Sequence, residues 1–165
     1  AFEKGIGVAK SITQSVLYYA QAADKGSAEA AYQLAEWYAN GENLAKDNTH
    51  GYDQKYRWGE KGDYDCSSAM ITAWESAGVP VKSNGATYTG NMYKVFKKCG
   101  FNDVTLSVDR HTGWRLLPGD VLLTRGRHTA MYIGNGQIVH ASTKATGIKI
   151  SNYTYRPPLC VRRYW

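Results

Sequence analysis

The feature that most constrains the fold is a change from helical to strand-like residue patterns within the last two thirds of the chain. Two helices are expected, at about Cys66 to Ala77 and Thr89 to Cys99. After the LPGD sequence that ends at Asp120, short runs rich in β-forming residues predict strands over 120–124, 128–133, 137–142 and near 159–164. Helices followed by a meander of strands indicate an α+β fold with an antiparallel sheet.

The first 45 residues have a different organisation, because they contain an internal repeat. The sequence FEKGIGVAK from Phe2 is matched by YANGENLAK from Tyr38, an offset of 36 residues. Two stretches with helical spacing, 12–25 and 27–40, lie between the copies, and a period of this length is typical of helical solenoids. We expect residues 1–45 to form a helical hairpin that serves as a docking or spacer module, and residues 46–165 to form a second domain.

The start of the chain and its charge limit the classes of function. The chain begins without an initiator Met or an apolar signal core, which we interpret as a cut inside a longer protein without its targeting segment. No apolar run reaches the length that spans a bilayer, so we expect no membrane span. The 20 Lys+Arg against 14 Asp+Glu favour polyanionic surroundings. The basic residues are scattered, which argues against nucleic-acid binding: Lys94, Lys97, Lys98, Arg125, Arg127, Arg162 and Arg163.

Cys66 is the candidate nucleophile. The three cysteines include no Cys-x-x-Cys pair, which argues against a zinc knuckle and a disulfide framework; whether Cys99 and Cys160 pair stays open. Cys66 opens the predicted helix on its buried face, where unpaired backbone N–H groups and the helix dipole stabilise a thiolate. The preceding Asp65 opposes that effect if it is close, so we assign it to capping the helix rather than to proton transfer.

The base comes from one of four histidines: His50, His111, His128 and His140. The first two lie in polar loops, whereas His128 and His140 lie in predicted strands joined by Gly134-Asn135-Gly136. A three-residue loop places Ala130 opposite His140, and His128 then points to the same side of the sheet. A two-residue Asn135-Gly136 turn is the form that Asn-Gly generally favours, and it would place the two rings on opposite faces.

The longer loop would assign roles to these residues. His128 would take the thiol proton and later protonate the leaving amine, and His140 would fix the tautomer and orientation of His128. The backbone N–H of Cys66 would donate to the oxyanion, joined by the Tyr56 hydroxyl.

Four blocks, in this order, resemble the NlpC-type cysteine peptidases: YRWGEKGDYDCSS (56–68), LLPGDVLL (116–123), RHTAMYIGNG (127–136) and IVHAS (138–142). AKDNTHGYDQ (45–54) and NGATYTGNM (84–92) look like the phage-endolysin branch of that family. YYAQAADKGSAEAAYQLAEWY (18–38) resembles the Sel-like repeats, which are related to the tetratricopeptide repeat. The first resemblance implies a papain-like NlpC-type fold over residues 46–165, and the second implies the helical hairpin before it.

The resemblance to the peptidases also implies a site. It implies that Cys66 is the nucleophile, that His128 is the base and that His140 orients the base. Around them, the residues expected to serve the oxyanion or the substrate groove are Tyr56, Trp58, Asp65 and Ser67. The sequence departs from the family at Ser68, where Gly is common, although endolysin-type members tolerate this serine.

We therefore expect a cysteine hydrolase of bacterial peptidoglycan that needs no cofactor and no metal. The expected target is the γ-D-glutamyl bond to the diamino acid of the stem peptide; the alternative is the N-acetylmuramoyl-L-alanine bond cut by some endolysins. Such an enzyme would act on the cell wall, whether secreted, periplasmic or delivered by a phage, and the repeat could bind a protein partner. Three rival hypotheses are a zinc site on Cys66, His128 and His140, a wall-binding module without catalysis, and an acyltransferase.

Overall fold

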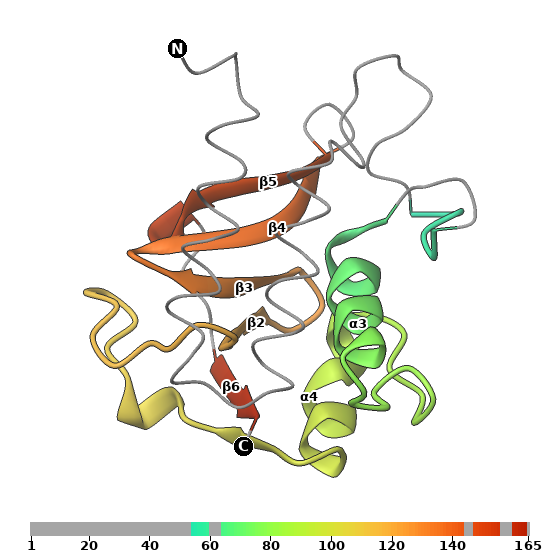
Figure 1. Cartoon of the computed structure of the whole chain (residues 1–165), viewed down its shortest axis with the longest axis horizontal. Helices are drawn as coiled ribbons and strands as arrows, with labels where there is room; N and C mark the ends of the chain where they lie inside the picture. Colours follow the sequence, from blue (N-terminus) through green and yellow to red (C-terminus); the bar gives the residue numbers. More distant parts are fainter. Residues whose placement is uncertain (1–53, 60–63, 144–146, 156–159, 165) are drawn as a thin grey trace.

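The computed structural model describes residues 54–59, 64–143, 147–155 and 160–164 (Figure 1). The predicted repeat of residues 1–45 lies outside this part of the chain, as does His50. No helix in the part described is long and apolar enough to cross a membrane.

Two helices and six strands make up the described part. The helices are α3 (Cys66–Ser76) and α4 (Thr89–Lys98), each ending one residue before its predicted limit. The strands are β1 (Phe101–Asp103), β2 (Val121–Thr124), β3 (His128–Gly134), β4 (Gln137–Thr143), β5 (Gly147–Asn152) and β6 (Cys160–Tyr164). Two short 3-10 helices follow β1 and β5, at Thr105–Ser107 and Tyr153–Tyr155. The expected α+β class is confirmed, but β1 and β5 are strands that the sequence analysis missed.

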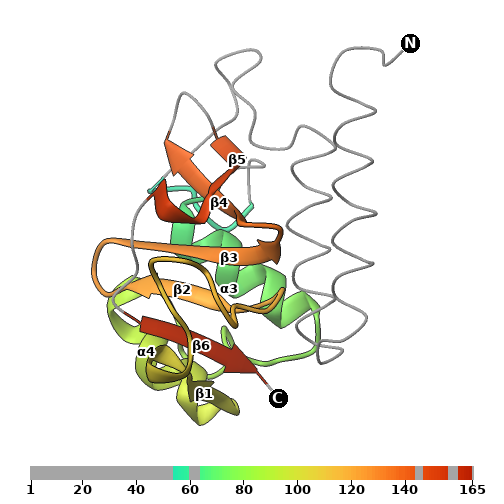
Figure 2. The same ribbon diagram turned by 90° about the vertical axis from the view of Figure 1, so that its left-hand side faces the viewer.

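The strands form a single antiparallel sheet in the order β1-β6-β2-β3-β4-β5. The last strand, β6, therefore returns to lie between β1 and β2. In the turned view of Figure 2, α3 lies behind β2 and β3 and covers one face of the sheet. The helix that begins with Cys66, α3, contacts both β3 and β4, the strands that carry the two predicted catalytic histidines.

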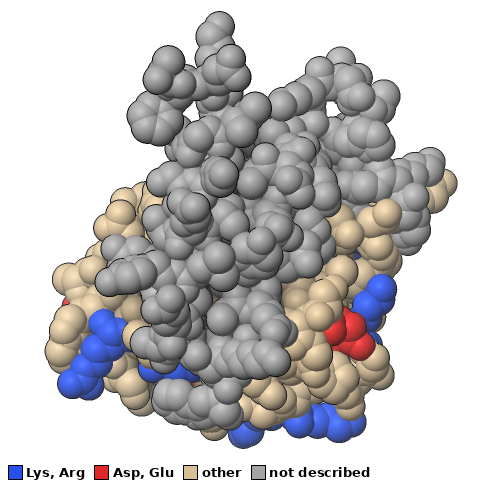
Figure 3. All heavy atoms as spheres, viewed as in Figure 1, with Lys and Arg blue, Asp and Glu red and all other residues tan. Residues whose placement is uncertain are grey.

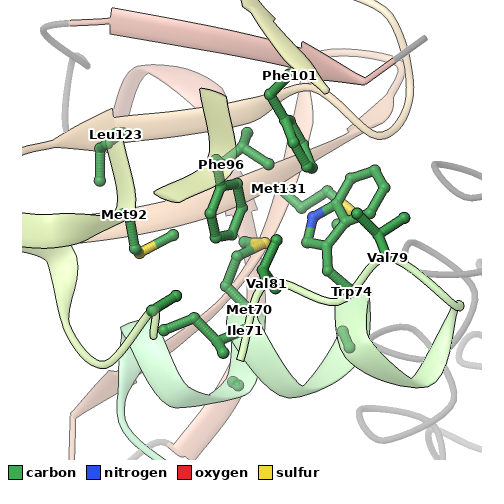
Figure 4. Packing of buried hydrophobic residues seen from close by; sticks show 14 of the residues in the cluster. Met70, Ile71, Trp74, Val79, Val81, Met92, Phe96, Phe101, Leu123 and Met131 are labelled. Carbon is green, nitrogen blue, oxygen red and sulfur yellow. The ribbon is translucent and has the colours of Figure 1, made fainter. Parts of the chain in front are cut away.

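The main core lies between the two helices and the sheet (Figure 4). The predicted inner face of α3 is confirmed, because Met70, Ala73 and Trp74 are buried along it. Trp74 meets Phe101 edge to face at 4.7 Å between ring centroids. Burial of such large apolar side chains stabilises a fold by about 1.5–3 kcal/mol each, so this cluster anchors α3 firmly to the sheet.

A second apolar cluster covers the opposite face of the central strands. Its members come from the loops after β1 and from the middle of the sheet: Val104, Val108, Leu116, Leu122, Ala130, Tyr132, Ile138 and Val161. With apolar packing on both sides, every residue of β3 is buried. The strand that begins with His128 is therefore held on both faces.

The hairpin between β3 and β4 combines the two alternatives that the sequence analysis left open. Gly134 pairs with Gln137, so the connection is the two-residue turn, with φ of 52° at Asn135 and 70° at Gly136, as a type I′ turn requires. Beyond the turn the pairing shifts, because Ile133 is an extra residue in β3, and Met131 then pairs with Val139. This is the register expected for the three-residue loop. The short turn therefore does not place the histidines on opposite faces.

The basic side chains visible on one face of the described part are scattered, in agreement with the sequence. In Figure 3, Lys and Arg side chains lie in several separate places rather than in one continuous patch.

Candidate active site

Cys66 is the first residue of α3 and is 6% exposed. Asp65 is the N-cap: its Oδ1 accepts a hydrogen bond from the Ser68 N–H at 2.7 Å, and its own N–H donates to the Ser68 hydroxyl at 2.9 Å. These reciprocal bonds form a capping box, so the expected capping role of Asp65 is confirmed. They fix the first turn of the helix and hence the backbone that carries the thiol.

His128 and His140 lie side by side on the same face of the sheet. His128 Nε2 is 2.8 Å from His140 Nδ1, and His140 Nε2 is 2.9 Å from the Ser151 hydroxyl on β5. His128 is 6% exposed and His140 2% exposed, so the two rings meet away from bulk water. The prediction that the two imidazoles are adjacent is confirmed.

The bond between the rings determines which nitrogen of His128 can act as a base. Nε2 is engaged with His140, so in its predicted role as the base His128 would accept the thiol proton at Nδ1. For neutral His128 to accept at Nδ1, its proton must be on Nε2 and point to His140 Nδ1. The proton of His140 must then be on its own Nε2 and point to Ser151. Three side chains thus form an ordered chain in which every ring nitrogen has an assigned role.

Arg57 is a residue of the site that the sequence analysis did not single out. Its Nε donates to Asp65 Oδ2 at 2.7 Å, and its terminal nitrogens donate to the Thr87 carbonyl at 2.7 Å and to the Ser67 hydroxyl at 3.2 Å. It therefore joins the segment before α3, the helix cap and the segment before α4. Arg57 lies in the block of residues 56–68 that carries the family resemblance, but neither its role nor that of Ser151 follows from local sequence, because both act through contacts with other segments.

Of the other expected site residues, Trp58 and Ser67 contact the cap or Arg57. Trp58 is half-buried, with the Arg57 guanidinium 4.7 Å and the Lys82 ammonium 4.5 Å from its ring centroid. Tyr56 is 40% exposed. Ser67 is buried, and its hydroxyl donates to Asp65 Oδ1 at 2.8 Å, which makes it part of the cap. The roles of Tyr56, Trp58, Asp65 and Ser67 towards an oxyanion or a substrate stay predictions.

The remaining thiols have different surroundings. Cys99 and Cys160 are free thiols and do not pair with each other. Burial raises the pKa of both Cys99 and Cys160, and Asp103 raises that of Cys160 further. These two thiols are therefore poor nucleophiles at neutral pH, since the thiolate is the reactive form. His111 lies on the surface, as expected.

A thiol at a helix start and an oriented imidazole pair are the components that cysteine peptidases use to attack an amide. The model of the NlpC/P60 family matches residues 53–159 of the chain. The chain belongs to the NlpC/P60 family. Membership supports a peptidoglycan-related endopeptidase activity, and the matched domain is a cysteine peptidase of the NlpC type.

Individual relatives agree with this family. A protein of Haemophilus influenzae described as a probable endopeptidase NlpC homolog is 30% identical over 124 residues, covering 67% of this chain and 67% of that protein. The solved structures of NlpC1 and NlpC2 from Trichomonas vaginalis are similar in fold, with TM-scores of 0.57 and 0.54 at 22% and 23% identity. Each match covers 87% of this chain but only 45% and 48% of those structures, so the chain spans about half their length.

Proposed function

We propose that the protein hydrolyses the stem peptide of bacterial peptidoglycan with Cys66 as the nucleophile, and that it cuts the γ-D-glutamyl bond to the diamino acid. The observation that carries this proposal is the series of hydrogen bonds from His128 on β3 through His140 on β4 to Ser151 on β5, since α3 packs against β3 and β4. A thiol peptidase needs an ordered imidazole as its base, whereas a wall-binding module has no use for one.

The proposed reaction has two stages. His128 Nδ1 takes the proton of the Cys66 thiol, and the sulfur attacks the amide carbon of the substrate. The backbone N–H of Cys66, at the start of α3, donates to the oxyanion, and the Tyr56 hydroxyl is the second expected donor. His128 then gives its proton to the leaving amine, and a thioester remains on Cys66.

The second stage releases the enzyme. Water attacks the thioester while His128 takes one of its protons, and the carboxylic acid product and the Cys66 thiolate separate. During both stages His140 keeps the His128 ring in one orientation, and its Nδ1 lone pair stabilises the imidazolium through the Nε2 proton. We propose that this reaction takes place at the bacterial cell wall, reached by secretion, in the periplasm or through a phage. Binding of a protein partner to the predicted repeat of residues 1–45 stays a prediction.

A digest of purified peptidoglycan tests the proposal. Sacculi with diaminopimelate and sacculi with lysine in the stem are incubated with the protein, with Cys66→Ala and with Cys99→Ser. Cys99 is a matched control, because it is a second free thiol whose raised pKa makes it a poor nucleophile. Mass spectrometry then identifies the soluble fragments.

Each outcome of the digest is decisive for one part of the proposal. Fragments that begin with the free diamino acid, from the native protein and Cys99→Ser but not from Cys66→Ala, support the γ-D-glutamyl cut. Intact stem peptides that begin with L-alanine would show that the protein cuts the N-acetylmuramoyl-L-alanine bond instead. No fragments from any wall would overturn the hydrolase proposal in favour of a binding module or an acyltransferase.

A further inference from the structure

The carboxylate of Asp65 lies directly before the nucleophile, where its charge opposes a thiolate. A negative charge next to Cys66 disfavours a second negative charge on the sulfur. Asp65 is 7% exposed, so water screens this repulsion poorly. Some other group must offset that charge if Cys66 is to ionise near neutral pH.

We propose that Arg57 is a positioning residue that keeps Cys66 reactive by neutralising the Asp65 carboxylate. This proposal rests on the proposed role of Cys66 as the nucleophile. The Arg57 Nε lies 2.7 Å from Asp65 Oδ2, and the two side chains are only 13% and 10% exposed. Because the two charges are this close and largely excluded from water, solvent screens their attraction only weakly. The pair therefore acts on the thiol as a dipole rather than as an isolated negative charge.

The two oxygens of Asp65 have separate partners, and this separation makes the electrostatic role testable. Oδ1 accepts from the Ser68 N–H and the Ser67 hydroxyl, which is the capping function. Oδ2 accepts from Arg57. An asparagine at position 65 can keep the cap through its single carbonyl oxygen while removing the charge, because Asn and Asp are comparable N-caps.

Arg57 is itself held in place by contacts that do not involve Asp65. The Thr87 carbonyl accepts from both of its terminal nitrogens, one of them at 2.7 Å, and the Trp58 ring lies 4.7 Å from the guanidinium carbon. Two fixed anchors orient the planar guanidinium so that Nε points to the carboxylate. A lysine would keep the charge but lose this orientation.

The other charged and titratable groups around the start of α3 are few in the described part of the chain. His128 on β3 and His140 on β4 belong to the strands that pack against α3, and they are bonded to each other. Lys82, from the segment between α3 and α4, lies over the Trp58 ring. The ion pair that the described structure shows at Asp65 is made with Arg57.

The test measures ionisation of the Cys66 thiol without any peptidoglycan. The full chain is treated with iodoacetamide across a range of pH, and mass spectrometry of the Cys66 peptide gives the alkylation rate at that residue alone. The variants are Arg57→Ala, Arg57→Lys and the double variant Arg57→Ala/Asp65→Asn. Lys98→Ala, which removes a surface cation from the last turn of α4, is the control for net charge.

For Arg57→Ala, the pH midpoint of alkylation is expected to rise by about one unit, which lowers the rate about tenfold below the midpoint. Arg57→Lys is expected to shift the midpoint less. The double variant is expected to return it to within a few tenths of the native value, because it removes the negative charge along with its partner. Lys98→Ala is expected to leave the midpoint unchanged.

Two results would overturn the proposal. One is an unchanged midpoint in Arg57→Ala with a native circular dichroism spectrum. The other is a raised midpoint that the double variant leaves raised in a folded protein, since a purely structural role predicts that result. Failure of the proposed function would look different: the alkylation shifts would be as expected, but the native protein would release no fragments from peptidoglycan.

Discussion

Replacing His140 by alanine removes the acceptor that fixes the His128 tautomer. His128 Nε2 and His140 Nδ1 are 2.8 Å apart in a site where both rings are buried. The proposed reaction turns His128 into an imidazolium, so the lost hydrogen bond is one made to a charged group, worth about 1.5–3 kcal/mol. Since about 1.4 kcal/mol corresponds to a factor of ten, kcat is expected to fall about 10- to 150-fold. KM is expected to change little, because His140 is 2% exposed and acts through His128.

Two further variants make the expectation specific. Ser151→Ala removes the outer bond of the chain, which holds His140 Nε2 at 2.9 Å. A neutral bond of that kind contributes about 0.5–1.5 kcal/mol, so kcat is expected to fall about 2- to 10-fold. His140→Gln keeps a carbonyl acceptor and is expected to retain more activity than His140→Ala.

The assay is release of stem-peptide fragments at saturating peptidoglycan, followed by mass spectrometry, at a temperature where each variant is folded by circular dichroism. The reasoning is wrong if folded His140→Ala keeps kcat within about twofold of the native protein. It is also wrong if Ser151→Ala loses more activity than His140→Ala, because the inner bond must matter more than the outer one.

Substitutions at three other positions test the fold that positions the site. Arg163→Ala leaves the carboxylate of Asp120, which is 1% exposed and held by two bonds of 2.7 Å, without its cation; urea unfolding should show a loss of about 3–5 kcal/mol at neutral pH. Burial raises the pKa of Asp120 and Arg163 lowers it, so without Arg163 the carboxyl takes a proton more readily. The loss in the free energy of unfolding should therefore shrink as pH falls towards 4. A loss that does not depend on pH would contradict this account. Gly136→Ala places a side chain at φ of 70° in the hairpin turn, and chemical denaturation should show destabilisation by about 1–2 kcal/mol; no change would mean that the turn relaxes freely. Trp74→Phe removes a buried N–H that has no hydrogen-bond partner in the described structure, so it should lower the free energy of unfolding by less than about 1.5 kcal/mol. Trp74→Ala should lower it by about 3–5 kcal/mol in urea unfolding. Equal losses for the two variants would contradict this distinction.

Local sequence predicted the elements that carry the chemistry. The start of α3 at Cys66, the cap at Asp65 and the starts of β3 and β4 follow from apolar spacing and cap residues, which act over a few positions. The missed strands β1 and β5 lie at the two edges of the sheet; β1 has only three residues and depends on pairing with the distant β6, and β5 pairs with the preceding β4.

The tertiary structure decided how these parts meet. The Asn135-Gly136 turn is encoded locally, but the extra residue Ile133 sets the register that brings His128 to His140, because a shift of one residue changes the face of every side chain in a strand. Ser151 reaches His140 only because β5 pairs with β4, and Arg57 reaches Asp65 only because the segments before α3 and α4 converge. The sequence by itself therefore determined which side chains could do the chemistry. Their partners and their orientation came from contacts between residues far apart in the chain, which no local pattern encodes.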